Sequence, residues 1–253
     1  MCIDVVIDGI HYYLEPEAGT AMVEEHPYAG MVVIPDSVTY QGKSFAVIEI
    51  DDEAFAGCDA LTAVFVPSSI VRIGREAFDG CQVQLYIDTL ESWMNTDIDF
   101  EIYDEDGPIE DPTHNLPYVA SALFVKGHPV EELKVPEGIT QIKKWQFHGW
   151  QFLTSLETPD AVSRIGYEAF LGCEGLKSVT LGCGTKEISA HAFSGLKNLT
   201  EFCCLAEDAP MIHPKAFDGT DIENHVTLYV PEKIIDKYKT ASPWNHFHQI
   251  SGI

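Results

Sequence analysis

Two groups of residues have the types that a reactive or metal-binding site needs. Cys203 and Cys204 precede His213, and a thiol with an imidazole base is the arrangement of a cysteine nucleophile. His246 and His248 have the spacing of a metal-ligand pair. Both groups fall in segments that we expect to be strands, where neighbouring side chains point to opposite faces. Cys204 is then predicted in the core and Cys203 outside it, with no base beside the exposed thiol.

The two histidines would share one face of a strand, but zinc needs further protein ligands and no third one lies within sequence reach. No serine has a nucleophile-elbow context, and no G-x-G-x-x-G or Walker pattern is present. The sequence therefore predicts no catalytic, cofactor or metal site. The Asn198-Leu-Thr200 sequon matters only in a source that glycosylates.

An acidic segment is the most distinctive charged feature of the chain. Residues 97–111 hold eight acidic residues in fifteen, and no Lys or Arg occurs between Glu76 and Lys126. A calcium loop over residues 104–107 is one hypothesis, but the EF-hand spacing with its sixth-position Gly and closing Glu is absent. A solvated loop is favoured. Asp104, Glu105 and Asp106 are a candidate docking site for a basic patch on a partner.

The overall charge excludes one large class of function. Lys and Arg number 15 against 40 Asp and Glu, which gives a formal charge of −25. Such a chain cannot bind nucleic acid by neutralising phosphates. A hydrophobic fraction of 45% is typical of a globular protein, and no apolar stretch approaches the ~20 residues of a membrane span. Asp4 and Asp8 interrupt the apolar start, so we expect no signal peptide; either the protein stays inside, or the chain begins after a removed signal.

A repeat organises the positions of all these residues. Phe55 and Phe78 are 23 residues apart, and Phe147, Phe170 and Phe193 continue the same spacing. Two further phenylalanines extend the series to seven predicted anchors: Phe217 after 24 residues, and Phe124 one step before Phe147. An aliphatic residue stands five places before each anchor, at Ile50, Ile73, Val119, Ile142, Ile165, Ile188 and Ile212. Six anchors have a Gly two places later.

A period of this length indicates a solenoid whose turns bury apolar residues by stacking on one another. The segments 61–67 and 176–181 have the L-x-x-L-x-L form of a leucine-rich repeat strand. Three residues after the anchors come Cys58, Cys81, Trp150, Cys173 and Leu196, which is the exchange pattern of a core-filling position. Cys58 and Cys81 lie close enough on adjacent coils for a disulfide, but we predict free thiols because the column also takes Trp and Leu.

The phrase Ile-Gly-x-x-Ala-Phe-x-Gly-Cys occurs at residues 73–81 and 165–173, and Val-Pro closes strands at residues 66–67 and 135–136. These motifs, over about residues 45–230, resemble the BspA-type leucine-rich repeat. The resemblance implies a protein that is extracellular or at the cell surface, mostly of host-associated microbes, with some members acting as adhesins. No cofactor is implied.

The predicted fold is an α/β solenoid of about 23-residue coils, with parallel strands on the concave face and short helical turns opposite. Residues 1–44 are predicted as a β-hairpin cap, 45–87 and 119–225 as repeat coils, and 226–253 as a strand–helix–strand cap, in one continuous domain. Residues 88–118 form the acidic insert, with a short helix that a capping box of Asp88 and Glu91 would begin.

The favoured function is a non-catalytic module for protein interaction or adhesion, because a stack of parallel strands offers an extended face for partners. Two outward residues per strand give columns of Ala63, Glu132, Ser155, Ser178, Glu201 and of Phe65, Lys134, Glu157, Thr180, Cys203. They are predicted to be mixed, without an aromatic run. Lys134, Glu157, Thr180, Glu201 and Phe65 are the candidate contacts to an unknown protein or host matrix component, bound by a monomer. Carbohydrate binding, a structural surface role and a cysteine- or metal-dependent enzyme are the alternatives.

Overall fold

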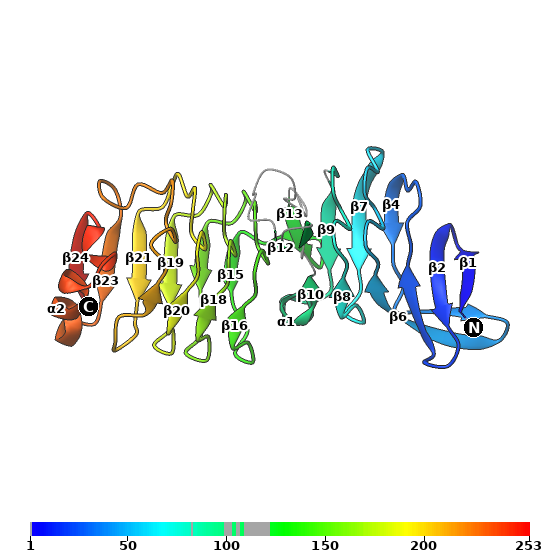
Figure 1. Cartoon of the computed structure of the whole chain (residues 1–253), viewed down its shortest axis with the longest axis horizontal. Coiled ribbons are helices and arrows are strands. Elements are labelled where there is room, and N and C mark those ends of the chain that lie inside the picture. The colour runs from blue at the N-terminus through cyan, green and yellow to red at the C-terminus, as the bar shows by residue number, and fades with distance from the viewer. Residues whose placement is uncertain (1, 82, 99–102, 105–106, 109–121) are drawn as a thin grey trace. The chain divides into compact units, whose positions relative to one another are not determined.

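A computed structural model describes residues 2–81, 83–98, 103–104, 107–108 and 122–253. The chain forms two compact units, Met1–His128 and Pro129–Ile253, and each carries its own sheets of stacked strands (Figure 1). The strands are short and regularly spaced because each 23-residue coil contributes one short strand to each sheet. The predicted solenoid of parallel strands is confirmed.

Unit 1 begins with the two predicted hairpins. Strand β1 (Ile3–Ile7) pairs antiparallel with β2 (Ile10–Glu15), and β5 (Ser37–Tyr40) pairs antiparallel with β6 (Lys43–Ile50). Both turns need two successive residues with positive φ, and they use Asp8-Gly9 (50° and 83°) and Gln41-Gly42 (50° and 77°). Strand β3 (Thr20–Val23) joins β2 to β6 and so connects the first hairpin to the solenoid.

The strands of unit 1 form two larger sheets and one two-stranded pair. The seven-stranded sheet runs β1-β2-β3-β6-β8-β10, with β5 on β6, β8 at Arg72–Ile73 and β10 at Asp97–Ile98. The five-stranded sheet runs β14-β13-β9-β7-β4, with bounds His128–Pro129, Ala122–Val125, Gln84–Ile87, Leu61–Val66 and Gly30–Val33. A separate pair is formed by β11 (Tyr103–Asp104) and β12 (Gly107–Pro108).

The short helix of the insert, α1 (Leu90–Asn95), begins at a different cap from the predicted one. Thr89 is the N-cap, and its hydroxyl accepts a hydrogen bond from Ser92 N at 3.1 Å. Asp88 instead accepts hydrogen bonds from Ser68 N and Oγ, at 2.8 and 3.0 Å, and ties the helix entry to the preceding coil. The prediction of a capping box of Asp88 and Glu91 was wrong, because Thr89 and not Asp88 directly precedes the helix, and the Thr89 hydroxyl caps it.

Unit 2 stacks two parallel sheets. The six-stranded sheet consists of β15 (Glu132–Lys134), β17 (Ser155–Glu157), β19 (Ser178–Leu181), β21 (Glu201–Cys204), β23 (Thr227–Val230) and β24 (Gln249–Gly252). The four-stranded sheet consists of β16 (Gln141–Ile142), β18 (Arg164–Ile165), β20 (Glu187–Ile188) and β22 (Met211–Ile212). Repeat-equivalent residues pair in register, as with Leu156 and Val179.

Stacked phenylalanine rings fill the core between the sheets. In unit 2 the centroids of Phe147, Phe170, Phe193 and Phe217 follow one another at 5.2, 5.5 and 5.7 Å. In unit 1, Tyr28 extends the stack of Phe55 and Phe78, with centroids 4.9 and 5.0 Å apart. The expectation for Phe124 was wrong: it lies in strand β13, and Val119 lies outside the described residues.

The turns that carry the anchor phenylalanines are closed by successive backbone hydrogen bonds between residues three apart. In one coil, Leu171 N donates to Glu168 O at 3.2 Å and Cys173 N to Phe170 O at 3.2 Å. The chain then reverses at Gly172, where φ is +70°, a conformation that favours glycine. In this coil the segment that was expected to be a short helical turn is a tight hydrogen-bonded turn and not a helix.

The cysteine column has a polar role besides filling the core. Cys81 Sγ donates to Phe55 O at 2.8 Å, and Cys173 Sγ donates to Phe147 O at 3.0 Å. Thr220 occupies the same column and donates to Phe193 O at 2.7 Å. All seven cysteines are free thiols, and burial raises the pKa of Cys173 to about 12. Cys81 and Cys173, whose thiol pKa values burial raises, are therefore unreactive donors to carbonyl groups of the preceding coil.

The C-terminal cap closes unit 2. A 3-10 turn η1 (Glu232–Ile234), helix α2 (Ile235–Thr240) and a second 3-10 turn η2 (Trp244–His246) connect β23 to β24. Tyr238 and Trp244 are buried, and each donates a hydrogen bond to a backbone carbonyl oxygen. Tyr238 Oη donates to Ala206 O at 3.1 Å, and Trp244 Nε1 donates to Pro210 O at 3.0 Å. Among the described helices, none has the length and apolar character of a membrane span.

Candidate functional site

The structure does not bring the possible cysteine site together. Cys203 lies half-buried and Cys204 buried in β21 of the six-stranded sheet, as the strand alternation predicted. His213 directly follows β22 of the other sheet, and its Nδ1 accepts a hydrogen bond from Lys215 N at 3.2 Å. Burial raises the pKa of the Cys203 thiol, which disfavours the nucleophilic thiolate. Cys203 and His213 therefore do not form a nucleophile–base pair.

The two C-terminal histidines do not lie on a strand. His246 ends the 3-10 turn η2, and His248 lies between that turn and β24. Both side chains are exposed, and the expectation of a shared strand face was wrong because the chain turns at Pro243 and Trp244. In the part of the chain that the structure describes, no three His, Cys, Asp or Glu side chains are grouped to hold a metal ion.

The outward columns of unit 2 are in the predicted register. Lys134, Glu157 and Thr180 occupy one row across β15, β17 and β19, which we call the unit 2 row. Glu201 belongs to the neighbouring row, on β21. Lys134 Nζ lies 3.7 Å from Glu157 Oε2, with the two side chains 75% and 61% exposed. Such an exposed ion pair contributes little to stability, so these groups are available to a partner.

Phe65 belongs to a different sheet from the unit 2 row. It lies on β7 of unit 1, in register with Val33, Tyr86 and, through Tyr86, Phe124. Ring centroids of Phe65 and Tyr86 are 4.4 Å apart, and those of Tyr86 and Phe124 are 4.8 Å apart, with interplanar angles of 13° and 17°. We call Val33, Phe65, Tyr86 and Phe124 the aromatic strip. Its strands β4, β7, β9 and β13 are labelled in Figure 1.

The expectation that the outward columns hold no aromatic run was therefore wrong for unit 1. The 23-residue spacing fails there, because Tyr86 follows Phe65 after 21 residues and Phe124 follows Tyr86 after 38. A usable signal was present in the local patterns of residues 84–87 and 122–125, which place an aromatic residue third in each strand. Ala63, expected to face outward, is 4% exposed.

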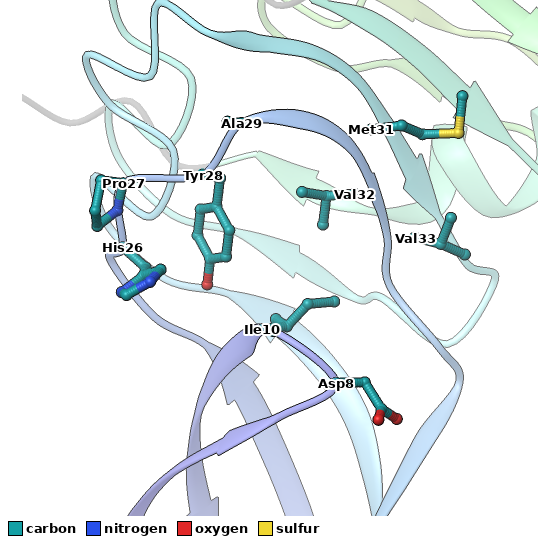
Figure 2. Close-up of a pocket in the computed structure, with 10 residues that line it drawn as sticks. Asp8, Ile10, His26, Pro27, Tyr28, Ala29, Met31, Val32 and Val33 are labelled. Atoms are coloured by element: carbon teal, nitrogen blue, oxygen red, sulfur yellow. The ribbon is translucent and has the colours of Figure 1, made fainter.

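A pocket of about 490 Å³ adjoins the aromatic strip. It is lined by Asp8, His26, Tyr28, Met31 and Val33, among others. Figure 2 shows the Tyr28 ring between His26 and Val32, with its hydroxyl directed towards Ile10. That hydroxyl accepts a hydrogen bond from His11 N at 3.1 Å and donates to Glu24 O at 2.9 Å. Burial raises the pKa of Tyr28, so the pocket wall presents a neutral phenol.

The acidic candidates lie mostly beyond the described part of the chain. Asp104 is in β11, where it pairs with Gly107 of β12. Glu105 and Asp106 lie outside the described residues. Their proposed docking role stays a prediction.

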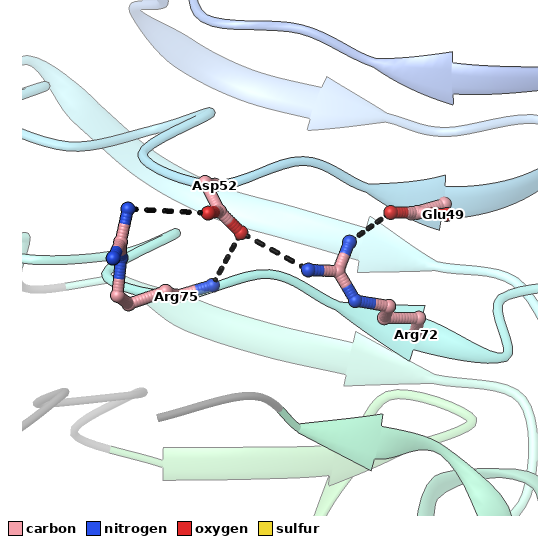
Figure 3. Close-up of polar contacts among 4 residues, drawn as sticks. All are labelled: Glu49, Asp52, Arg72 and Arg75. Atoms are coloured by element: carbon pink, nitrogen blue, oxygen red, sulfur yellow. Dashed lines mark hydrogen bonds and ion pairs between the residues drawn. The ribbon is translucent and has the colours of Figure 1, made fainter. Parts of the chain in front are cut away.

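A charged cluster that sequence reasoning missed lies across β6 and β8 of unit 1. Arg72 bridges Glu49, its register partner, and Asp52, whose Oδ1 is 3.2 Å from Arg72 Nη2 (Figure 3). Arg75 N donates to Asp52 Oδ1 at 2.9 Å, and its Nη2 lies 3.4 Å from Oδ2. The carboxylates stand on one coil and the arginines on the next, so the cluster joins neighbouring coils.

A buried polar group is found on the turn side of unit 2. His148 Nδ1 lies 3.6 Å from Glu168 Oε2, with the two side chains 6% and 4% exposed. The same carboxylate oxygen accepts a hydrogen bond from Trp145 Nε1 at 3.0 Å, whereas His148 Nδ1 has no hydrogen-bond partner among the described residues. Burial lowers the pKa of His148, against the opposing effect of Glu168.

This geometry predicts an acid-sensitive contribution to stability. Because the folded-state pKa of His148 lies below the ordinary 6.5, the unfolded chain binds more protons between the two values. The contribution is complete above 6.5 and is lost as the pH falls towards the folded pKa. His148→Leu should flatten the slope of the unfolding free energy against pH in that range, by at most about 1.4 kcal/mol per pH unit.

The slope is measured by urea unfolding between about pH 5 and 7.5. His248→Leu, at an exposed site, is the control and should leave it unchanged. The hydrogen bond to Asp4 raises the pKa of His11, so the contribution of His11 to stability has the opposite pH dependence. His11 is present in the wild type and in both variants, so it does not affect the comparison. Equal slopes in wild type and His148→Leu would contradict the assignment.

Comparison with known proteins identifies the family. The BspA type Leucine rich repeat region matches residues 33–96 and 118–239, in six copies. Since this is more than half of the sequence, the chain belongs to the BspA-type leucine-rich repeat family.

Two solved structures are similar to this chain, and the first of them shows the same fold. A leucine-rich repeat protein of T. pallidum is 22% identical with a TM-score of 0.50, over 83% of this chain and 86% of that chain. A leucine-rich repeat protein from Bacteroides ovatus is 19% identical with a TM-score of 0.47, over 99% and 77%. A search of curated proteins found no match.

Proposed function

We propose that this protein is a non-catalytic interaction module that binds a protein partner at the cell surface. The observation that carries the proposal is the row of outward residues on unit 2, where Lys134, Glu157 and Thr180 stand side by side on parallel strands. These strands are held by the buried phenylalanine stack, so the row is a pre-organised surface. Membership of the BspA-type family, whose proteins are mostly surface-associated, supports the location.

The favoured partner is a protein, for example a host matrix component, bound by a monomer of this chain. The unit 2 row alternates a cation, an anion and a hydroxyl, which suits a surface with complementary charges. Carbohydrate binding is the second candidate, and the aromatic strip is the observation that favours it. Sugars, however, stack on ring faces, and both faces of Tyr86 are occupied by Phe65 and Phe124.

The test is a binding screen of the whole chain against immobilised matrix proteins and against a glycan array. We expect binding to at least one protein, and a loss of about tenfold or more in affinity for Thr180→Arg, because a long side chain would disrupt the centre of the row. Gln151→Arg, at an exposed turn position of unit 2, is the matched control.

Binding of glycans alone would favour the carbohydrate alternative. Binding of neither class would favour a structural surface component. Equal effects of Thr180→Arg and Gln151→Arg would show that the unit 2 row is not the contact surface.

A further inference from the structure

The aromatic strip is an exposed apolar surface with a defined length. Met31 and Val33, on its edge strand β4, are 61% and 58% exposed, and the three rings are half-buried. Four strands in register, spaced by about 4.8 Å, give the strip a length of about 14 Å. That length corresponds to about four residues of extended peptide.

The strip ends in the pocket of unit 1. Met31 and Val33 line that pocket and are also the register neighbours of Ala63 and Phe65. Figure 2 shows Val33 on one side of the pocket, with Asp8 below it and His26 on the far side. A chain that follows the strip can therefore place one further side chain in a cavity of about 490 Å³ with a carboxylate at its rim.

Unit 1, which carries the strip and the pocket, has a strongly negative net charge. Residues 1–128 hold 24 acidic and 4 basic residues, a difference of −20, whereas residues 129–253 hold 16 and 11, a difference of −5. Two of the four bases of unit 1, Arg72 and Arg75, are engaged by Glu49 and Asp52. The field of unit 1 thus attracts cations and repels acidic surfaces.

We propose that the aromatic strip and the adjoining pocket bind an extended, basic peptide segment of a partner protein through its apolar side chains. The proposal rests on the proposed function and names both the surface and the chemistry of the ligand. Side chains of an extended peptide alternate between two faces, so a segment that alternates apolar and basic residues lays its apolar face on the rings. Its basic side chains gain from the negative field of unit 1.

The probe is a fluorescently labelled eight-residue peptide of alternating lysine and leucine, titrated against the whole chain in an anisotropy assay. We expect saturable binding that weakens with salt. A lysine–serine peptide lacks the apolar face and should bind much more weakly, and a glutamate–leucine peptide should not bind. Tyr86→Ser should weaken the lysine–leucine affinity by about fivefold or more, since it removes about 1 kcal/mol of apolar contact.

Tyr229→Ser is the matched control, because Tyr229 is a half-buried tyrosine on strand β23 of unit 2. The Tyr229→Ser variant should bind the lysine–leucine peptide with an affinity within about twofold of the wild-type value, a difference of only about 0.4 kcal/mol. Val33→Ser, at a 58% exposed site, is a second strip variant that spares the rings and should also weaken binding. Equal affinities for all three variants and the wild type, or equal binding of the lysine–serine peptide, would overturn the proposal.

The experiments distinguish a failure of the peptide-binding proposal from a failure of the proposed interaction function. If a partner from the binding screen is lost with Thr180→Arg but unaffected by Tyr86→Ser, the interaction function holds and the strip is not its site. If Tyr86→Ser abolishes glycan binding while no peptide binds, the strip is a carbohydrate surface and the peptide proposal is wrong.

Discussion

Phe170→Ala is expected to lower the free energy of unfolding by about 3–5 kcal/mol, the range found when a fully buried aromatic ring is removed. The Phe170 side chain is 0% exposed, and its ring lies between those of Phe147 and Phe193 at interplanar angles of 4° and 1°. The neighbouring rings belong to the adjacent coils, so the cavity would open in the centre of the stack. Urea unfolding followed by circular dichroism measures the change.

Phe152→Ala is the matched control for this experiment. Phe152 belongs to the same unit, carries the same side chain and is 56% exposed. Its loss should change the unfolding free energy by less than about 0.5 kcal/mol. A cost below about 1 kcal/mol for Phe170→Ala would mean that the ring does not lie in a packed core.

The repeat was predictable from the sequence because burial leaves a periodic signal. A position that stacks on its equivalent in the next coil must be apolar in every coil, as Phe147, Phe170 and Phe193 show. The two hairpin turns were also predictable, since Asp8-Gly9 and Gln41-Gly42 supply the positive φ that the turn demands. Local chemistry and spacing were sufficient in both cases.

The outward surface of unit 1 could not be derived from the same period. Solvent-facing positions need not keep a residue type from coil to coil, so only strand pairing shows which of them are neighbours. Phe65, Tyr86 and Phe124 come together because β9 pairs with both β7 and β13, although β9 and β13 are separated by the insert. The spacing-based prediction placed Phe124 in the core, whereas the alternation within its strand places it outside.

The buried His148 and Glu168 were missed for a related reason. Glu168 and Tyr167 both stand in the turn of one coil, and the sequence does not show which of them points inward. Glu168 has a φ of 52°, an uncommon conformation for a residue other than glycine. In that conformation its buried carboxylate accepts a hydrogen bond from Trp145 Nε1 of the preceding coil.

Gly166→Ala is expected to destabilise the protein by about 2–3 kcal/mol, because the added methyl group would collide with backbone atoms. A Cβ at Gly166 would lie 2.6 Å from Lys144 N and 2.7 Å from Lys143 C, and neither atom can rotate away. Gly166 N also donates to Ile142 O at 2.9 Å, so moving the turn outward would break a hydrogen bond between coils. Urea unfolding measures the loss.

Gly138→Ala separates this collision from the general effect of replacing a glycine. No atom of the described residues lies within 4 Å of a Cβ at Gly138, which is exposed in a turn of the same unit. The substitution should therefore be neutral or add up to about 1 kcal/mol, through the reduced freedom of the unfolded chain. Ser189 occupies the place of Gly166 in the next coil, so the repeat pattern alone does not predict a strict need for glycine. If Gly166→Ala were as well tolerated as Gly138→Ala, the coils could not be packed backbone against backbone at this turn.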